Sequence, residues 1–139
     1  MDIHTDIPLK NYVTMRIGGN ARFMTDIHSA DDIPALVKRA MSQNLPIYIL
    51  GGGSNTIVRD EGYPGLVLRN RIPGFTVIAE TASDATIKIG AGENWDDVVR
   101  RTVEMNLSGI EFIGYPRYCG RCPCSKHWRL RPRSRRNTG

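Results

Sequence analysis

The sequence predicts an α+β domain built in two lobes. Residues 21–50 have the pattern strand, helix, strand, and three glycines follow directly. Residues 66–106 change to short strands separated by turn residues, followed by a helix, which is typical of an antiparallel sheet. A chain of 139 residues suffices for one folded domain. We therefore expect the first lobe at residues 1–65 and the start of the second at 66–115.

The first lobe is predicted to contain a strand–helix–strand unit. Residues 21–27 alternate like a strand, Ser29 is placed to cap a helix that ends near Asn44, and Pro34 falls in the first turn of that helix. The apolar stripe of this helix, which we expect to be core, comprises Ile33, Leu36, Val37, Ala40 and Met41. Residues 46–50 form a continuous apolar run, typical of a strand buried on both faces of a sheet. The unit predicts parallel strands with a right-handed crossover.

A glycine-rich loop follows this strand, where open α/β sheets bind ligands. The loop consists of Gly51, Gly52, Gly53, Ser54 and Asn55. Its glycines can adopt positive φ and present bare amides to an anion such as a pyrophosphate. A simple tight turn is the alternative interpretation. A Rossmann or Walker A site is not predicted, because neither the further glycine, the following helix nor the Gly-Lys-Ser/Thr ending is present.

The second lobe is predicted from three short strands and one helix. The strands are expected at residues 66–69, 75–79 and 85–89, and the helix at 95–106. Trp95, Val98, Val99 and Val103 share one helix face, so we expect Trp95 to be a core residue.

Charge and cysteine content divide the chain at residue 116. Residues 1–115 hold 11 basic and 14 acidic residues, whereas residues 116–139 hold 8 basic residues and no acidic one. The three cysteines also lie in this tail, and the cysteine-free first part predicts a cytoplasmic protein. No apolar run approaches the ~20 residues that span a bilayer, so no membrane partner is expected. His4 and His28 are expected at the surface.

Several segments together resemble the amino-terminal part of the UDP-N-acetylenolpyruvoylglucosamine reductases, flavoproteins of peptidoglycan synthesis. They are Leu9-Lys10-Asn11 with Thr14, Ile49 to Asn55, Val67 to Ile72, Ile89 to Trp95, and Gly109 to Phe112. The resemblance implies a two-lobed FAD-binding domain of the p-cresol methylhydroxylase and vanillyl-alcohol oxidase type, with the FAD pyrophosphate at Gly51 to Asn55. It also implies a UDP-sugar substrate and NADPH as the reductant of the flavin, which carries the hydride.

The sequence departs from this family after Tyr115. The family continues as I-P-G-x-x-G-x-x-P-x-Q-N-x-G-A-Y-G, but this chain does not, and the simplest explanation is the loss of two bases from the missing Ile codon. One permitted set of codons for residues 116–131, read from the second base, translates as P-G-T-A-G-A-A-P-V-Q-N-I-G-A-Y-G. The codons of Lys126 to Arg129, shifted in this way, can only give Asn or Ser, then Ile or Thr, then Gly. We therefore interpret residues 116–139 as out of frame and expect them to be disordered.

This interpretation predicts a truncated and inactive domain. The proton donor and substrate-binding residues of the family lie downstream, so no catalytic residue is assigned. The alternative is a small binding module whose basic tail contacts zinc or nucleic acid, with Cys119, Cys122, Cys124 and His127 as metal ligands. We favour neither a metal site nor specific nucleic-acid binding, because an out-of-frame tail is basic and cysteine-rich by accident.

Overall fold

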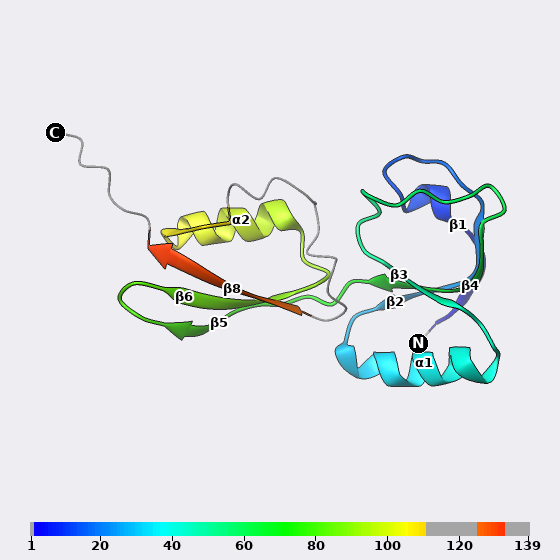
Figure 1. Cartoon of the computed structure of the whole chain (residues 1–139), viewed down its shortest axis with the longest axis horizontal. Helices are drawn as coiled ribbons and strands as arrows, with labels where there is room; N and C mark the ends of the chain where they lie inside the picture. The colour runs from blue at the N-terminus through cyan, green and yellow to red at the C-terminus, as the bar shows by residue number, and fades with distance from the viewer. Residues whose placement is uncertain (1, 111–124, 133–139) are drawn as a thin grey trace.

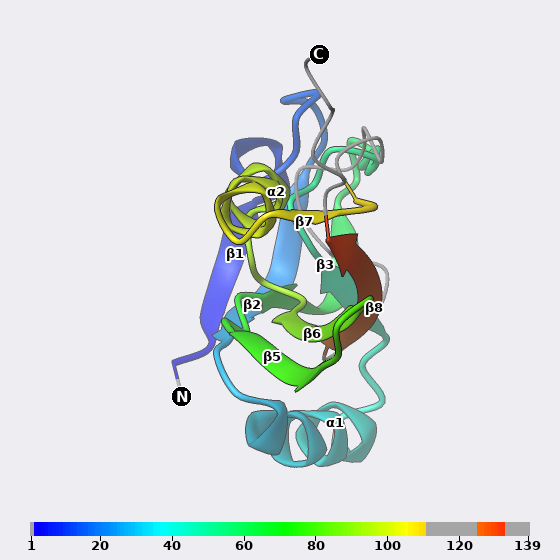
Figure 2. The ribbon, with the colours of Figure 1, turned by 90° about the vertical axis from the view of Figure 1, so that its left-hand side faces the viewer.

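The computed structural model describes residues 2–110 and 125–132 of the chain. These residues fold into two lobes (Figure 1), and each lobe contains one four-stranded sheet. One α-helix lies on each sheet, α1 in the first lobe and α2 in the second (Figures 1 and 2). The two-lobed α+β prediction is confirmed.

The first lobe has the strand order β1-β2-β4-β3. β1 is antiparallel to β2, whereas β2, β4 and β3 are mutually parallel. The strands are β1 (His4–Pro8), β2 (Asn20–Ile27), β3 (Ile47–Leu50) and β4 (Tyr63–Asn70). The parallel strand–helix–strand unit is therefore present, with β4 inserted between its two strands.

The position of β4 corrects two expectations. The sequence prediction started the second lobe at residue 66, but β4 is an inner strand of the first sheet, and Leu66, Val67 and Leu68 are buried. β3 was expected to be buried on both faces, but it lies at the sheet edge, and Ile49 is 48% exposed. The crossover through α1 places β3 one strand away from β2, and β4 fills the position between them. A strand in this inner position is covered on both faces. The boundary between the lobes therefore follows Asn70.

A short 3-10 helix, Ala30–Asp32, precedes helix α1 (Ile33–Ser42). Ser29 caps the 3-10 helix, because its hydroxyl oxygen accepts a hydrogen bond from the Asp31 amide at 3.2 Å. Leu36 and Ala40 pack against Ile27, Leu66 and Leu68. Met41, predicted to be core, is instead 71% exposed. The buried stripe of α1 is narrow and is centred on Leu36 and Ala40. Met41 follows Ala40 and lies outside the surface that contacts the sheet.

The second lobe has the strand order β5-β6-β8-β7, and α2 lies over one face of this sheet (Figure 2). Its elements are β5 (Phe75–Glu80), β6 (Ala85–Gly90), α2 (Trp95–Glu104), β7 (Leu107–Ser108) and β8 (Ser125–Pro132). Trp95 and Val98 pack with Ile87, Ile89 and Leu130 in one core cluster. The prediction that Trp95 is a core residue is confirmed.

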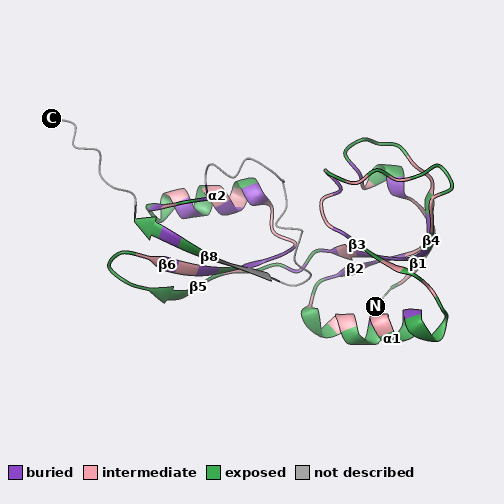
Figure 3. Cartoon of the chain, in the orientation of Figure 1, coloured by how far each residue is buried: buried purple, intermediate pink, exposed green. Residues whose placement is uncertain are grey.

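Strand β8 contradicts the expectation of a wholly disordered tail. It pairs with β6 antiparallel over six residues, from Ala85↔Leu130 to Gly90↔Ser125. Leu130 is 1% exposed, and its neighbours Arg129 and Arg131 are exposed. Figure 3 accordingly shows a buried band between two exposed bands on β8. Strand β8 forms for two reasons. Its side chains alternate, so Leu130 can enter the core, and it pairs with an edge of β6 that would otherwise be unpaired. Residues 116–124 and 133–139, predicted to be disordered, lie outside the described residues.

The connection between the two lobes is fixed by contacts of residues 90–93, which belong to the segment Ile89 to Trp95. The Gly92 amide donates to the Ile72 carbonyl at 2.8 Å, and the Gly90 amide donates to the Gly74 carbonyl at 2.7 Å. A Cβ on Gly92 would lie 2.3 Å from the Arg71 carbonyl carbon, so only glycine permits this approach. Glu93 accepts a hydrogen bond from the Gly74 amide at 2.8 Å. These contacts hold the end of β4 against the second lobe.

Candidate functional site

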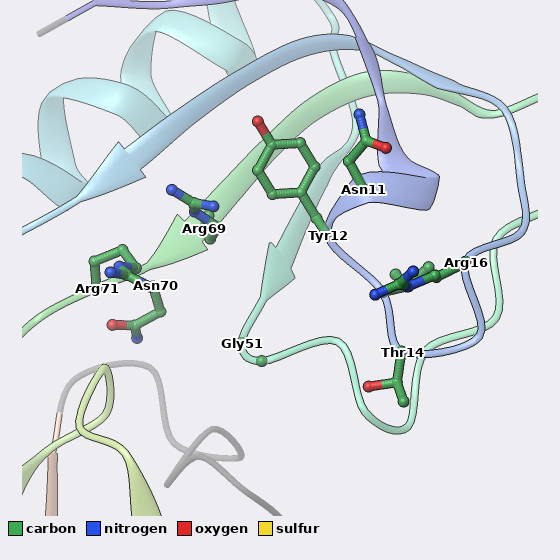
Figure 4. Close-up of a pocket in the computed structure, with 10 residues that line it drawn as sticks. Asn11, Tyr12, Thr14, Arg16, Gly51, Arg69, Asn70 and Arg71 are labelled. Carbon is green, nitrogen blue, oxygen red and sulfur yellow. The ribbon is translucent and has the colours of Figure 1, made fainter.

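The candidate site is a pocket of about 360 Å³ at the carboxyl ends of β3 and β4 (Figure 4). It is lined by Asn11, Tyr12, Val13, Thr14, Arg16, Gly51, Gly52, Arg69, Asn70 and Arg71. These residues come from three segments: the turn after β1, the glycine loop, and the end of β4. The carboxyl edge of parallel strands is where the sequence predicted a ligand.

The glycine loop is divided between the pocket and the protein interior. Gly51 and Gly52 line the pocket. Gly53 is buried with φ of 69°, and its carbonyl accepts a hydrogen bond from the Thr14 amide at 3.1 Å. A Cβ on Gly53 would lie 2.1 Å from the Tyr12 carbonyl oxygen. Gly53 therefore packs the loop against the turn that forms the other wall. Ser54 and Asn55 are not among the lining residues.

The pocket carries excess positive charge. None of its lining residues is acidic, and three are arginines. Arg69 is paired with Asp26, with Nε to Oδ1 at 2.7 Å and the second contact at 2.5 Å. Within the described part of the chain, no ion pair involves Arg16 or Arg71. Two uncompensated guanidinium groups beside backbone amides form an environment that favours an anion.

No helix follows the loop, as the sequence predicted. Residues 51–62 contain turns and irregular structure between β3 and β4. A helix dipole therefore adds nothing at this pocket, and the positive potential comes from amides and arginines. The pocket volume of about 360 Å³ lies in the range of small-molecule binding pockets.

Sequence reasoning missed several residues of this pocket. Asn11, Thr14, Asn70 and Arg71 were noted only as family-like positions, and Arg69 likewise. No sequence pattern indicated Tyr12 or Arg16 as pocket residues. They reach the pocket only because the turn after β1 contacts the glycine loop. That contact joins residues about forty positions apart, and a local pattern does not report such a separation.

A second pocket, of about 470 Å³, lies beside the first and shares Tyr12 and Arg69 with it. Its other lining residues are Asp2, His4, Ile7, Met24, Thr25, Asp26 and His28. His4 and His28 are exposed, as predicted. The Arg69 guanidinium lies 4.8 Å from the Tyr12 ring centroid, so these two residues are stacked where the pockets meet.

The described residues contain no group of three or more His, Cys, Asp or Glu side chains that could hold a metal ion. Cys119, Cys122 and Cys124, the thiols of the alternative zinc site, lie outside the described residues. No helix within residues 2–110 and 125–132 is both long and apolar enough to cross a membrane.

The chain is similar to known flavoenzymes in sequence and in fold. It is 38% identical over 125 residues to a UDP-N-acetylenolpyruvoylglucosamine reductase of Salinispora arenicola, covering 88% of this chain and 34% of that protein. The reductase of Thermus caldophilus superposes with a TM-score of 0.64 at 27% identity, covering 85% of this chain and 39% of the other. The chain thus spans about a third of the length of the curated relatives it matches.

A more distant structure shows the same fold. The 6-hydroxy-D-nicotine oxidase of Arthrobacter nicotinovorans has a TM-score of 0.56 at 21% identity, covering 78% of this chain and 25% of that one. This supports the two-lobed flavoprotein fold of the p-cresol methylhydroxylase and vanillyl-alcohol oxidase type. The alternative of a zinc- or nucleic-acid-binding module has no support among these relatives. A family model described as an FAD-binding domain matches residues 23–115, well over half of the sequence, and this chain therefore belongs to the family of FAD-binding domains.

Proposed function

We propose that the pocket at Gly51 and Gly52 holds the diphosphate of FAD, and that the chain is the amino-terminal part of a UDP-N-acetylenolpyruvoylglucosamine reductase. The observation that carries the proposal is the arrangement of the pocket: loop amides and two uncompensated arginines at the carboxyl edge of a parallel sheet. In such a reductase, NADPH is the reductant and a UDP-sugar the substrate. The absence of cysteine from residues 1–115 favours the reducing cytoplasm as its location.

The residues of this chain would bind and orient the cofactor. When bound, FAD supplies hydride transfer. The amides of Gly51 and Gly52 would donate to phosphate oxygens, and Gly53, packed on Tyr12, keeps the loop in the shape that presents those amides. The Gly92 and Glu93 contacts hold the end of β4, and with it Asn70 and Arg71, at the junction of the lobes. No residue of the chain is assigned to proton transfer.

We infer further that the reading frame changes between Tyr115 and Pro116. The match to the FAD-binding domain family ends at residue 115, which supports this position. The shifted translation of residues 116–131 supports it independently. Resequencing the genomic DNA across codons 110–120, and translating it in all frames, tests the inference. An unbroken frame whose other two translations lack the Q-N-x-G-A-Y-G pattern would refute it.

Binding and turnover test the proposed function separately. The 139-residue chain should be colourless as purified, because residues 116–131 do not carry the glycine-rich segment that, in the family it resembles, lies along the flavin. Without that segment the isoalloxazine stays hydrated and the affinity for FAD stays low. Titration should still give saturable binding of FAD and ADP, and weaker binding of riboflavin, which has no diphosphate. Restoring the frame with the downstream gene should yield a yellow protein that oxidises NADPH only in the presence of UDP-N-acetylglucosamine enolpyruvate. A frame-restored protein that is colourless and inactive would contradict the proposal.

A further inference from the structure

Two arginines of the pocket differ from the third in their surroundings. Arg69 donates to both carboxylate oxygens of Asp26 and stacks on Tyr12, so its charge is compensated within the protein. Arg16 and Arg71 are exposed, and among the described residues neither forms an ion pair. Figure 4 shows them on opposite sides of Gly51, with Arg16 in the turn after β1 and Arg71 at the end of β4. The pocket thus presents one uncompensated cation on each side of the loop amides.

The backbone at Arg16 is in a conformation that disfavours arginine. Its φ is 53°, in the left-handed region, and its amide closes a turn by donating to the Val13 carbonyl at 3.2 Å. Glycine adopts this conformation without steric cost, whereas a residue with a Cβ does not. Among the described residues, the exposed Arg16 side chain forms no hydrogen bond, ion pair or ring contact that would offset this strain. Of the four described non-glycine residues with a positive φ, Arg16 alone lines the pocket, and the other three are Asp6, Asn44 and Asn106. Asparagine and aspartate adopt this region more readily than arginine does.

The backbone at Arg71 is fixed from both lobes. Its amide donates to the Ile27 carbonyl at 2.9 Å in the first lobe. From the second lobe, Gly92 approaches so closely that a Cβ there would lie 2.5 Å from the Arg71 Cα. The root of this side chain is therefore rigid even though the guanidinium is exposed. The backbone of Arg71 on one wall and that of Arg16 in a hydrogen-bonded turn on the other are both held in place.

We propose that Arg16 and Arg71 form a two-sided clamp that makes the pocket selective for a diphosphate over a monophosphate. The proposal rests on the proposed function, because it assigns residues to the recognition of the same group. Gly51 lies between the two arginines in Figure 4, and the amides of Gly51 and Gly52 could serve either ligand. A monophosphate places its charge at one point, whereas a diphosphate presents charge on two neighbouring phosphoryl groups. Each guanidinium can therefore engage a different phosphoryl group of the diphosphate, whereas both must share the single phosphoryl group of a monophosphate.

Titration of the 139-residue chain with ADP and AMP tests the clamp without any need for turnover. The variants are Arg16→Gly, Arg71→Gln and, as the matched charge control, Lys38→Gln, an exposed cation of α1 outside the pocket lining. The wild-type chain should bind ADP more tightly than AMP, and raising the salt concentration should reduce this difference. Arg16→Gly and Arg71→Gln should each weaken ADP binding roughly tenfold and AMP binding less, whereas Lys38→Gln should bind both ligands like the wild type.

Thermal unfolding provides a second measurement, in which the same substitution that weakens ADP binding is expected to stabilise the fold. Arg16→Gly should raise Tm, because glycine adopts a φ of 53° without strain, while it weakens ADP binding. A purely structural role for Arg16 does not give that combination. If the folded variants keep wild-type ADP affinity and the preference over AMP, the clamp is wrong while ADP binding still supports the proposed function. If the wild-type chain binds neither ADP nor FAD, the clamp and the proposed site are both wrong.

Discussion

Arg69 on β4 and Asp26 on β2 are joined by two hydrogen bonds, at 2.7 and 2.5 Å, across neighbouring parallel strands. The two residues also lie directly opposite each other in the strand register, since their Cα atoms are partners. Their side chains are 32% and 26% exposed, so solvent screens them only in part. The guanidinium fixed in this way stacks on Tyr12, which lines both pockets. The sheet thereby positions a residue of the turn after β1.

Removing the arginine of this pair should destabilise the first lobe. Arg69→Gln leaves the Asp26 carboxylate without its bidentate partner and should lower the free energy of unfolding by about 2 kcal/mol. Arg100→Gln removes the more exposed Arg100–Asp97 pair of α2 and should change it by less than about 0.5 kcal/mol. Urea denaturation of both variants measures the difference. Equal effects would show that the Arg69–Asp26 pair contributes no more than an exposed pair.

Substituting alanine for Gly53 should disrupt the glycine loop. The new Cβ would lie 2.1 Å from the Tyr12 carbonyl oxygen, at a residue with φ of 69°. Backbone must move, so we expect a loss of more than about 2 kcal/mol and loss of ADP binding. Gly74→Ala is the control for conformation alone, since its φ is 145° and the nearest atom lies 3.9 Å from the added Cβ. Denaturation should show the larger loss for Gly53→Ala, and the reverse order would contradict the close packing at Tyr12.

Strand β8 should contribute measurably to the stability of the second lobe. Leu130 is 1% exposed in the cluster that contains Trp95, and Leu130→Ala should cost about 2–4 kcal/mol. Arg129→Ala removes an exposed side chain from the same strand and should cost less than about 1 kcal/mol. Tryptophan fluorescence during denaturation reports on this lobe, because both tryptophans, Trp95 on α2 and Trp128 on β8, belong to it. Were Leu130→Ala to unfold like the wild type, the tail would be disordered, as its sequence alone predicts.

The phenol of Tyr63 should make stability depend on pH in the alkaline range. Burial raises the pKa of Tyr63, and the neighbouring Tyr48 raises it further. A pKa raised in the folded state means that folding favours the protonated phenol. This contribution is complete below pH ~10, the ordinary pKa of tyrosine, and is lost as the pH rises further. Tyr63→Phe should therefore show a shallower fall in the free energy of unfolding above that pH, and identical slopes would exclude the effect.

Local sequence patterns predicted β2 to β6 and both α-helices but not β1, β7 or β8, because the period of apolar residues and the capping residues act within a few positions. Residues 21–27 and 85–89 alternate as strands do, and α2 begins at Trp95 as expected. Ser29 caps the short 3-10 helix that precedes α1, so α1 itself begins later, at Ile33. The glycine loop was likewise placed correctly after a parallel strand. These features depend on the conformation of neighbouring residues, which a single sequence reports directly.

Tertiary structure alone decided which strand became central and which residues met at the pocket. The apolar runs 46–50 and 66–69 look alike in sequence, but strand pairing placed β4 inside the sheet and β3 at its edge. The same pairing brought Arg71 opposite Arg16, and a free edge on β6 gave Leu130 a place in the core. Sheet order and contacts between distant segments depend on which surfaces can be covered together. That choice is made by the whole chain, and no local period encodes it.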